Sequence, residues 1–166
     1  MDEEHDRQRR LDELWASFDD LDEETFLARM DALAAELSDP AVAAFERASA
    51  FDSTGDEERA VALYRRALDL GLGPDRRRRA VIQLASSLRN VGRADESVAL
   101  LRAERDAGSD ELDDAVAAFL ALALVDAGRE REALSTALAA LAPHLRRYQR
   151  SLGSYARALL DERPAP

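Results

Sequence analysis

The sequence predicts an all-α fold of stacked helix-turn-helix repeats, which is an α-solenoid. One observation is that three glycines, Gly55, Gly92 and Gly128, lie in similar surroundings at spacings of 37 and 36 residues. A second is that apolar residues on both sides of each glycine follow the spacing of helical stripes. A third is the composition, 46% hydrophobic and 34% charged, which is typical of a globular protein rather than a disordered one. A chain of 166 residues suits one structural domain.

Several columns of the repeat match in register with the glycines. An alanine lies seven residues before each glycine, a large apolar residue four before it, and a small residue five after it. In order along the chain these columns are Ala48, Ala85 and Ala121, then Phe51, Leu88 and Leu124, then Ala60, Ser97 and Ala133.

Each unit is predicted to be two helices joined at its glycine. Glycine suits the position just after a helix, where a left-handed conformation costs it little. Small residues on facing positions allow the two helices to approach closely. A single helical hairpin cannot bury its apolar face alone, so neighbouring units must stack.

The repeats resemble those of the tetratricopeptide repeat family, whose units place small, aromatic and proline residues at fixed positions. The first unit carries the resemblance most fully, through Ala48, Phe51, Ala60, Tyr64 and Ala67. The tryptophan typical of the family is replaced by Ala44, Val81 and Ala117. The resemblance implies a right-handed superhelix with repeats at about 41–74, 78–111 and 114–142, within a segment spanning 40–142.

Both ends of the chain are predicted to be helical. Residues 1–39 form an acidic hairpin with stripes through Leu11, Leu14, Trp15 and Phe18, then Phe26, Met30, Leu33 and Leu37. Asp20 or Asp22 caps its second helix, and Pro40 opens the first repeat. Residues 143–162 form a C-terminal capping helix, with Leu145, Tyr148, Leu152, Tyr155 and Leu159 as its packing stripe.

Charge is unevenly distributed along the chain. The formal net charge is -11, and residues 1–40 contain 14 acidic but only 4 basic side chains. Two hypotheses follow for the N-terminal hairpin. It stacks on the first repeat and caps its apolar end, or it lies across the arginines of the repeats and occupies the groove.

Four consecutive arginines, Arg76 to Arg79, are predicted to form the first turn of a helix capped by Asp75. Successive helical residues point about 100° apart, so the four fan around the axis, with Arg76 and Arg79 on one face. One interpretation is that the four arginines lie at the solvent-exposed surface and form local ion pairs with nearby acidic residues. The alternatives are a ligand-facing role for Arg79 and, more weakly, nuclear targeting.

The residue inventory excludes most catalytic chemistry. The chain has no cysteine and no lysine, and His5 and His144 are isolated, so no nucleophile–base pair, metal site or cofactor site is expected and the chain is not an enzyme. The longest apolar run, residues 115–125, is far shorter than the ~20 residues of a bilayer span. The polar N-terminus is unlike a secretory signal, and a cytoplasmic location is expected.

The family resemblance implies a protein- or peptide-binding adapter, with a concave groove lined by the first helix of each unit. The partner is an unidentified protein or peptide, and the sequence leaves a homodimer open. The alternative function is arginine-mediated binding of nucleic acid or a phosphate ligand, which the acidic N-terminal segment opposes. The residues expected in the groove are Glu46, Ser49, Ser53, Arg79, Gln83, Ser86, Asn90, Phe119, Asp126, Arg147 and Tyr155.

Overall fold

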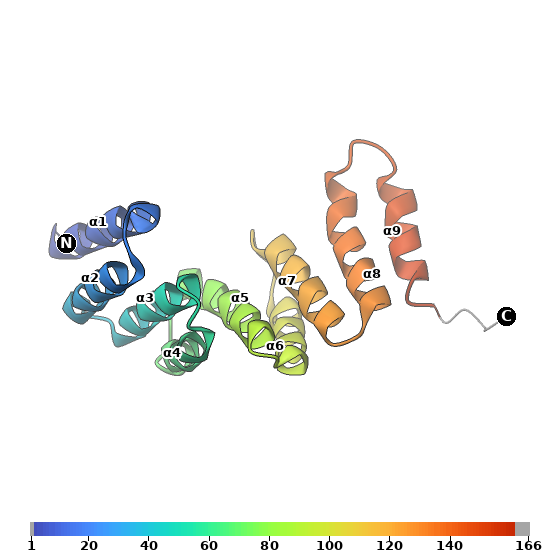
Figure 1. Cartoon of the computed structure of the whole chain (residues 1–166). Coiled ribbons are helices and arrows are strands. Elements are labelled where there is room, and N and C mark those ends of the chain that lie inside the picture. The colour runs from blue at the N-terminus through green and yellow to red at the C-terminus, as the bar shows by residue number, and fades with distance from the viewer. Residues whose placement is uncertain (1, 162–166) are drawn as a thin grey trace. The chain divides into compact units, whose positions relative to one another are not determined.

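The computed structural model describes residues 2–161, with side chains from residue 5 onward, and confirms the all-α fold class (Figure 1). Consecutive helices pack against each other, as expected for a tetratricopeptide-like solenoid. The elements in chain order are α1 (Asp2–Ala16), the 3-10 turn η1 (Phe18–Asp20), α2 (Glu23–Glu36), α3 (Pro40–Ser53), α4 (Glu57–Asp69), α5 (Pro74–Asn90), α6 (Ala94–Ala107), α7 (Asp113–Asp126), α8 (Glu130–Leu141), the 3-10 turn η2 (Ala142–His144) and α9 (Gln149–Ala158).

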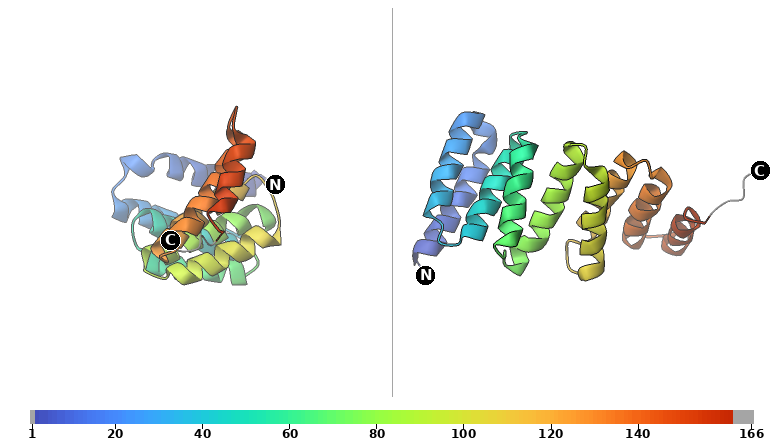
Figure 2. Two further views of the ribbon diagram at one scale, coloured as in Figure 1. Left: turned by 90° about the vertical axis from the view of Figure 1, so that its right-hand side faces the viewer. Right: turned by 90° about the horizontal axis from the view of Figure 1, so that it is seen from below.

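The chain divides into two compact units, Met1–Ser87 and Leu88–Pro166. The first unit contains α1 to α4 and most of α5, and the second contains the end of α5 and α6 to α9. Within each unit, successive helices lie side by side and run in opposite directions (Figure 2). This is the helical-hairpin arrangement that the repeat pattern predicts.

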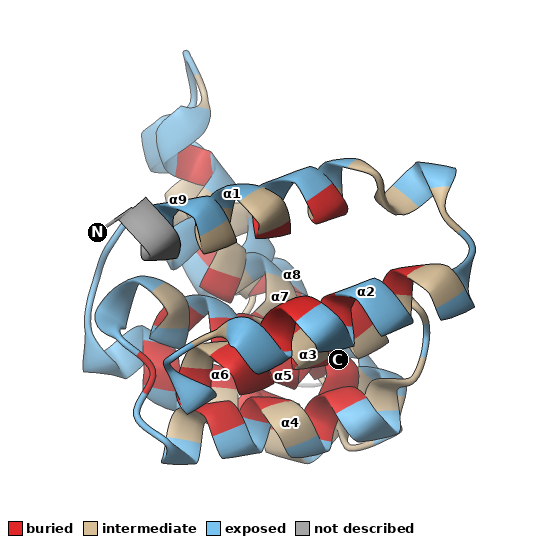
Figure 3. Ribbon diagram, turned by 90° about the vertical axis from the view of Figure 1, so that its left-hand side faces the viewer, coloured by how far each residue is buried: buried red, intermediate tan, exposed pale blue. Residues whose placement is uncertain are grey.

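The N-terminal hairpin packs its apolar stripes onto the first repeat. Leu11, Phe26 and Met30 are buried in one cluster that also contains Ala50 of α3. The ring of Phe26 lies 5.2 Å from that of Trp15, measured between ring centroids. Figure 3 shows buried positions along the faces of α2 and α3 that belong to this packing. These contacts support the stacking hypothesis for the hairpin.

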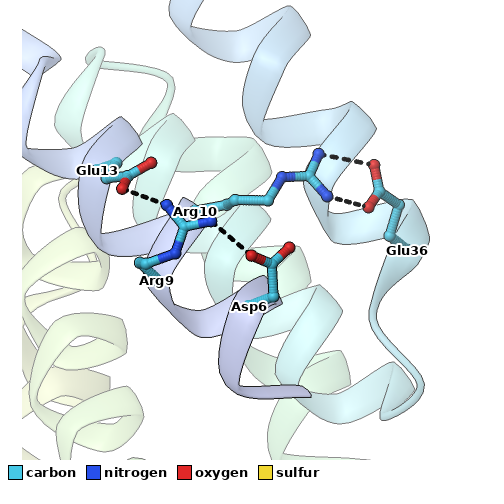
Figure 4. Close-up of polar contacts among 5 residues, drawn as sticks. All are labelled: Asp6, Arg9, Arg10, Glu13 and Glu36. Atoms are coloured by element: carbon cyan, nitrogen blue, oxygen red, sulfur yellow. Dashed lines mark hydrogen bonds and ion pairs between the residues drawn. The ribbon is translucent and has the colours of Figure 1, made fainter. Parts of the chain in front are cut away.

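The hairpin also pairs its own charges (Figure 4). Arg10 of α1 donates two hydrogen bonds to the carboxylate of Glu36 of α2, at 2.5 and 3.0 Å. Arg9 contacts both Asp6 and Glu13 along α1, each at 2.5 Å. All these side chains are well exposed and solvent screens their charges, so the pairs contribute little to stability. These carboxylates are therefore paired with arginines of the hairpin itself.

The three repeat glycines end their helices in the predicted conformation. Gly55, Gly92 and Gly128 have φ angles of 85°, 78° and 71°, which lie in the left-handed region. After each glycine, the next backbone N–H donates to the carbonyl of the large apolar residue four before it, at 2.8 to 2.9 Å. Phe51 and Leu124 are two of these acceptors. This is the Schellman pattern, and it repeats at all three turns.

The predicted helix starts are confirmed at two places and wrong at a third. Asp22 accepts a hydrogen bond from the backbone N–H of Thr25, and Pro40 occupies the first turn of α3. Asp75 does not cap α5. The helix begins at Pro74, and the carbonyl of Gly73 accepts the first helical hydrogen bonds. A proline at the first helical position has its φ fixed for the helix, which moves the start ahead of the aspartate.

The predicted packing stripe of the C-terminal helix is wrong at its two tyrosines, whereas Leu145, Leu152 and Leu159 are half-buried. Helix α9 begins at Gln149, because Tyr148 adopts a left-handed φ of 71° and breaks the helix expected to run through it. Tyr148 and Tyr155 are 75% and 69% exposed, whereas Ala156 is fully buried. The carbonyl of Ala156 accepts a hydrogen bond from the Ser135 hydroxyl of α8, so this small residue lies at the contact between the two helices. The helix itself packs against α8.

Candidate functional site

The candidate site is a pocket of about 260 Å³ inside the first unit. It lies where α1, α3 and α5 supply neighbouring side chains, and these are first helices of successive hairpins. Its lining combines two aromatic rings, a carboxylate, a guanidinium, an amide and two hydroxyls. The lining residues are Trp15, Phe45, Glu46, Ser49, Ser53, Arg79 and Gln83.

Glu46 is the buried acid of this pocket, with a relative exposure of 7%. Its carboxylate accepts a hydrogen bond of 3.2 Å from the indole nitrogen of Trp15, and it lies 3.8 Å from the guanidinium of Arg76. Burial raises the pKa of Glu46, and the hydrogen bond from Trp15 and the charges of Arg76 and Arg79 counteract that rise. The carboxylate is thus held in place from both α1 and α5.

The structure shows what the run of arginines does. Arg76 faces Glu46 and also donates a hydrogen bond of 2.8 Å to the side-chain oxygen of Gln8. Arg79 lies over the ring of Phe45, with its guanidinium carbon 5.6 Å from the ring centroid, in a cation–π contact. Both therefore lie on one side of α5, as predicted, and that side faces Glu46. Arg78 is buried and Arg77 is exposed, so the four do not form one cationic surface.

A polar network adjoins the pocket through Ser49, which belongs to its lining. The hydroxyl of Tyr64 donates toward Ser49 at 3.3 Å and toward Asp52 at 3.4 Å. The hydroxyl of Ser87 on α5 is 2.8 Å from the other carboxylate oxygen of Asp52. Burial raises the pKa of Asp52, and it also raises the pKa of the Tyr64 hydroxyl. The network joins α3, α4 and α5 and fixes the position of Ser49 in the lining.

One polar atom of the lining is not satisfied within the described part of the chain. The side-chain oxygen Oε1 of Gln83 is buried and has no hydrogen-bond partner there. Buried acceptors in native proteins are usually paired, so such an atom in a pocket wall calls for an explanation. A donor brought by a ligand would supply the missing hydrogen bond.

The predicted groove residues divide between the two units. Five of them, Glu46, Ser49, Ser53, Arg79 and Gln83, line this pocket, and Ser86 is half-buried on α5 outside its lining. The other five belong to the second unit: Phe119 is half-buried on α7, and Asn90, Asp126, Arg147 and Tyr155 are exposed.

Asp126 already has a partner in the second unit. Its carboxylate forms an ion pair of 2.9 Å with Arg89. The sequence predicts Tyr155 both on the packing stripe of the last helix and in the groove. Its exposure excludes a position on the packing stripe.

Sequence reasoning missed two residues of the pocket, Trp15 and Phe45. Trp15 was assigned to the apolar stripe of the N-terminal hairpin, and its ring does pack beside Phe18 and Phe26. Its indole N–H nevertheless reaches Glu46. The available signal was that α1 is the first helix of a hairpin, which is the position that lines the groove in such repeats. No glycine marks its turn, so the repeat pattern did not include it.

Among the described residues, no helix combines the length and apolar character that crossing a bilayer requires.

Comparison with known proteins assigns the family. The model of a family described as tetratrico peptide repeat matches residues 41–159, which is well over half of the chain. Searches of curated proteins and of solved structures gave no significant match. The family match, the three glycine turns in register and the packing of consecutive helices agree. The chain therefore belongs to the tetratricopeptide repeat family.

Proposed function

We propose that this protein is a non-catalytic adapter that binds an extended segment of a partner protein in the pocket of the first unit. The family is generally a protein-interaction scaffold without catalysis, and this supports the general role. The observation that carries the finer proposal is the unpaired Oε1 of Gln83 in the pocket wall. A backbone N–H of a bound peptide is the donor that such an acceptor lacks.

The charges of the pocket favour an acidic residue in the bound segment. Glu46 is held by Trp15 and Arg76, so its negative charge is partly compensated. Arg79 is exposed and lies over an uncharged ring, so its guanidinium can reach a carboxylate of a ligand. Trp15 and Phe45 provide apolar surface for the neighbouring side chain.

The arrangement of the arginines argues against the alternative of nucleic-acid or phosphate binding. Arg76 is occupied by Gln8 and Glu46, and Arg78 is buried. The segment that completes the pocket, residues 1–40, carries 14 acidic side chains. Neutralising a row of phosphates requires a continuous basic face, and α5 does not present one.

Panning a random peptide library on the full chain would test the proposal. We expect recovered peptides to carry an acidic residue, and their affinity to fall about tenfold or more in Arg79→Ala and in Gln83→Leu. Arg77→Ala is the matched control, because Arg77 is on the same helix but does not line the pocket. Peptides that bind all three variants as tightly as the wild type would contradict the proposal. So would binders whose affinity drops equally in the control.

A further inference from the structure

A second surface, in the second unit, is apolar and uncovered. We call it the α7/α8 face. Helix α7 has apolar residues on every side between its terminal aspartates, a pattern that normally indicates a fully buried helix. Yet Leu122 and Val125 are 47% and 49% exposed. They border a cavity of about 450 Å³ whose only charged lining residue is Glu130; the others are Ala118, Ala121, Leu122, Val125, Ala133, Leu134 and Ala137.

The repeat register identifies which positions these are. Counting from the glycine of each turn, Leu134 corresponds to Val61 in the first repeat and Val98 in the second. Val61 and Val98 are each 3% exposed, whereas Leu134 is 49% exposed. This repeat position is therefore buried in the first two repeats and exposed in the third.

The neighbouring position on the second helix repeats this contrast. Ala137 corresponds to Tyr64 and Leu101, both of which are fully buried, while Ala137 is exposed. The change cannot be attributed to a polar substitution, because the residues of the third repeat are as apolar as those of the second.

An α-helix covers this position in the two earlier repeats. In the first unit, Ser87 of α5 bonds to Asp52, and Asp52 in turn bonds to Tyr64, so α5 lies against the α3/α4 hairpin. In the second unit, α7 packs against α6, which carries Val98 and Leu101. In both cases the covering element is the first helix of the next hairpin.

Helix α9 does not cover the α7/α8 face. It is attached to a different side of α8, where the Ser135 hydroxyl donates to the Ala156 carbonyl at 2.7 Å. Arg131 of α8 donates to the Leu159 carbonyl at 3.1 Å. The side of α8 with Leu134 and Ala137 remains open while α9 is in place.

We propose that the α7/α8 face binds an amphipathic α-helix of a partner protein, in the place that the first helix of a further repeat would take. The helices that fill this place in the chain present small and medium aliphatic residues. On α5 these include Ala80, Val81, Leu84 and Ala85, all buried. The partner helix carries a stripe of alanine, valine and leucine at i, i+3, i+4 and i+7, and a basic residue that faces Glu130. This surface is separate from the pocket proposed above, and the two proposals stand independently.

A synthetic peptide that copies residues 74–90 is the appropriate probe, because α5 fills the corresponding place in the first repeat. We expect this labelled peptide to bind the full chain saturably in a fluorescence anisotropy titration. Leu134→Asp should weaken the binding about tenfold or more, and Ala137→Asp should weaken it similarly. Both residues are exposed, so neither variant should unfold the chain, and circular dichroism would verify this.

Leu70→Asp is the matched control, because Leu70 is 46% exposed and lies in the first unit. It should leave the affinity unchanged, and a peptide carrying Leu84→Asp should not bind the wild type. Absence of saturable binding at millimolar peptide would overturn the proposal, as would equal losses in Leu134→Asp and Leu70→Asp. Sedimentation that shows a wild-type dimer dissociated by Leu134→Asp would also overturn it, since a second copy would then occupy the face.

Discussion

The first and third repeats place the same backbone hairpin around different chemistry. Where α5 lies against the α3/α4 hairpin, Asp52 and Tyr64 are joined in a hydrogen-bonded network that includes Ser87 of α5. Between α7 and α8 the same positions hold Val125 and Ala137, and both are exposed. A hydrogen-bonded interior specifies one neighbouring helix by geometry, whereas a purely aliphatic one accepts any helix of suitable shape. The first repeat therefore fixes its neighbouring helix through hydrogen bonds, whereas the third repeat presents an exposed apolar surface to which a further helix can bind.

The largest expected contrast comes from placing the same charge at Val61 and Leu134. Val61→Asp buries a carboxylate without a partner and should cost about 4 kcal/mol or more of unfolding free energy. Leu134→Asp should change it by only about 0.5 kcal/mol, because the side chain is half exposed. Urea unfolding of both variants measures the difference. Equal losses would show that the third repeat is covered in solution.

Removing one hydroxyl tests the polar network of the first repeat. Tyr64→Phe deletes the donor to Ser49 and Asp52 and should lower the unfolding free energy by about 1 kcal/mol. Tyr155→Phe is the control, since Tyr155 is exposed and its hydroxyl should contribute about zero. Urea titrations of the two variants against wild type provide the measurement. A Tyr64→Phe variant as stable as wild type would mean that the hydroxyl does not hold the network.

Two aspartates should respond to pH with opposite signs. Burial raises the pKa of Asp52, so its contribution to stability is complete below the ordinary carboxyl pKa and is lost as the pH rises through the raised value. The backbone N–H of Thr25 lowers the pKa of Asp22, so its contribution is lost as the pH falls through the lowered value.

The measurement is the unfolding free energy of Asp52→Asn and Asp22→Asn relative to wild type, from about pH 7 down to about pH 3, because the Asp22 effect falls below the ordinary carboxyl pKa. Acidification should favour the wild type in the comparison with Asp52→Asn and disfavour it in the comparison with Asp22→Asn. Asp52→Asn removes a carboxylate charge from the polar network, and Asp22→Asn removes the same charge from a helix cap. Shifts of the same sign would contradict the assigned causes.

The smallest expected difference between the two repeats is at the glycines of their turns. Gly55→Ala and Gly128→Ala each force a side chain into a left-handed conformation and should each cost about 1 kcal/mol. No atom lies within 4 Å of the added methyl group at either glycine, so the cost is conformational only. Gly108→Ala is the control, because its φ of 172° is ordinary extended backbone. Unequal losses at Gly55 and Gly128 would show that the turns differ as the interiors do.

The sequence could predict the features that depend on local chemistry. Gly55, Pro40 and Asp22 have a conformational or capping role that neighbouring residues decide, and the structure has each in that role. The repeat fold follows from such positions recurring in register. The sequence predicts a start of α5 at Arg76, two residues later than the observed start at Pro74, because Pro74 and Asp75 both favour a helix start and the two signals compete.

The features that failed depend on contacts between elements. Periodicity marked Tyr155 as a packing residue, but the left-handed Tyr148 starts α9 later and the small Ala156 forms the contact. Trp15 was recognised as apolar, yet the direction of its indole N–H depends on where α3 places Glu46. The exposure of Leu134 could not be predicted either, because the equivalent residues Val61 and Val98 are buried by the first helix of the next hairpin.

The attachment of α9 has a consequence for how this protein can change over generations. Ser135 and Arg131 of α8 bind α9 through its main-chain carbonyls, at Ala156 and Leu159. Main-chain oxygens are present whatever the side chain, so most substitutions on the outer surface of α9 leave its attachment intact. Positions such as Tyr155 and Arg157 can therefore drift freely or be recruited to a new task. The outer surface of α9 can therefore gain new side chains, and with them a new binding function, without loss of the fold.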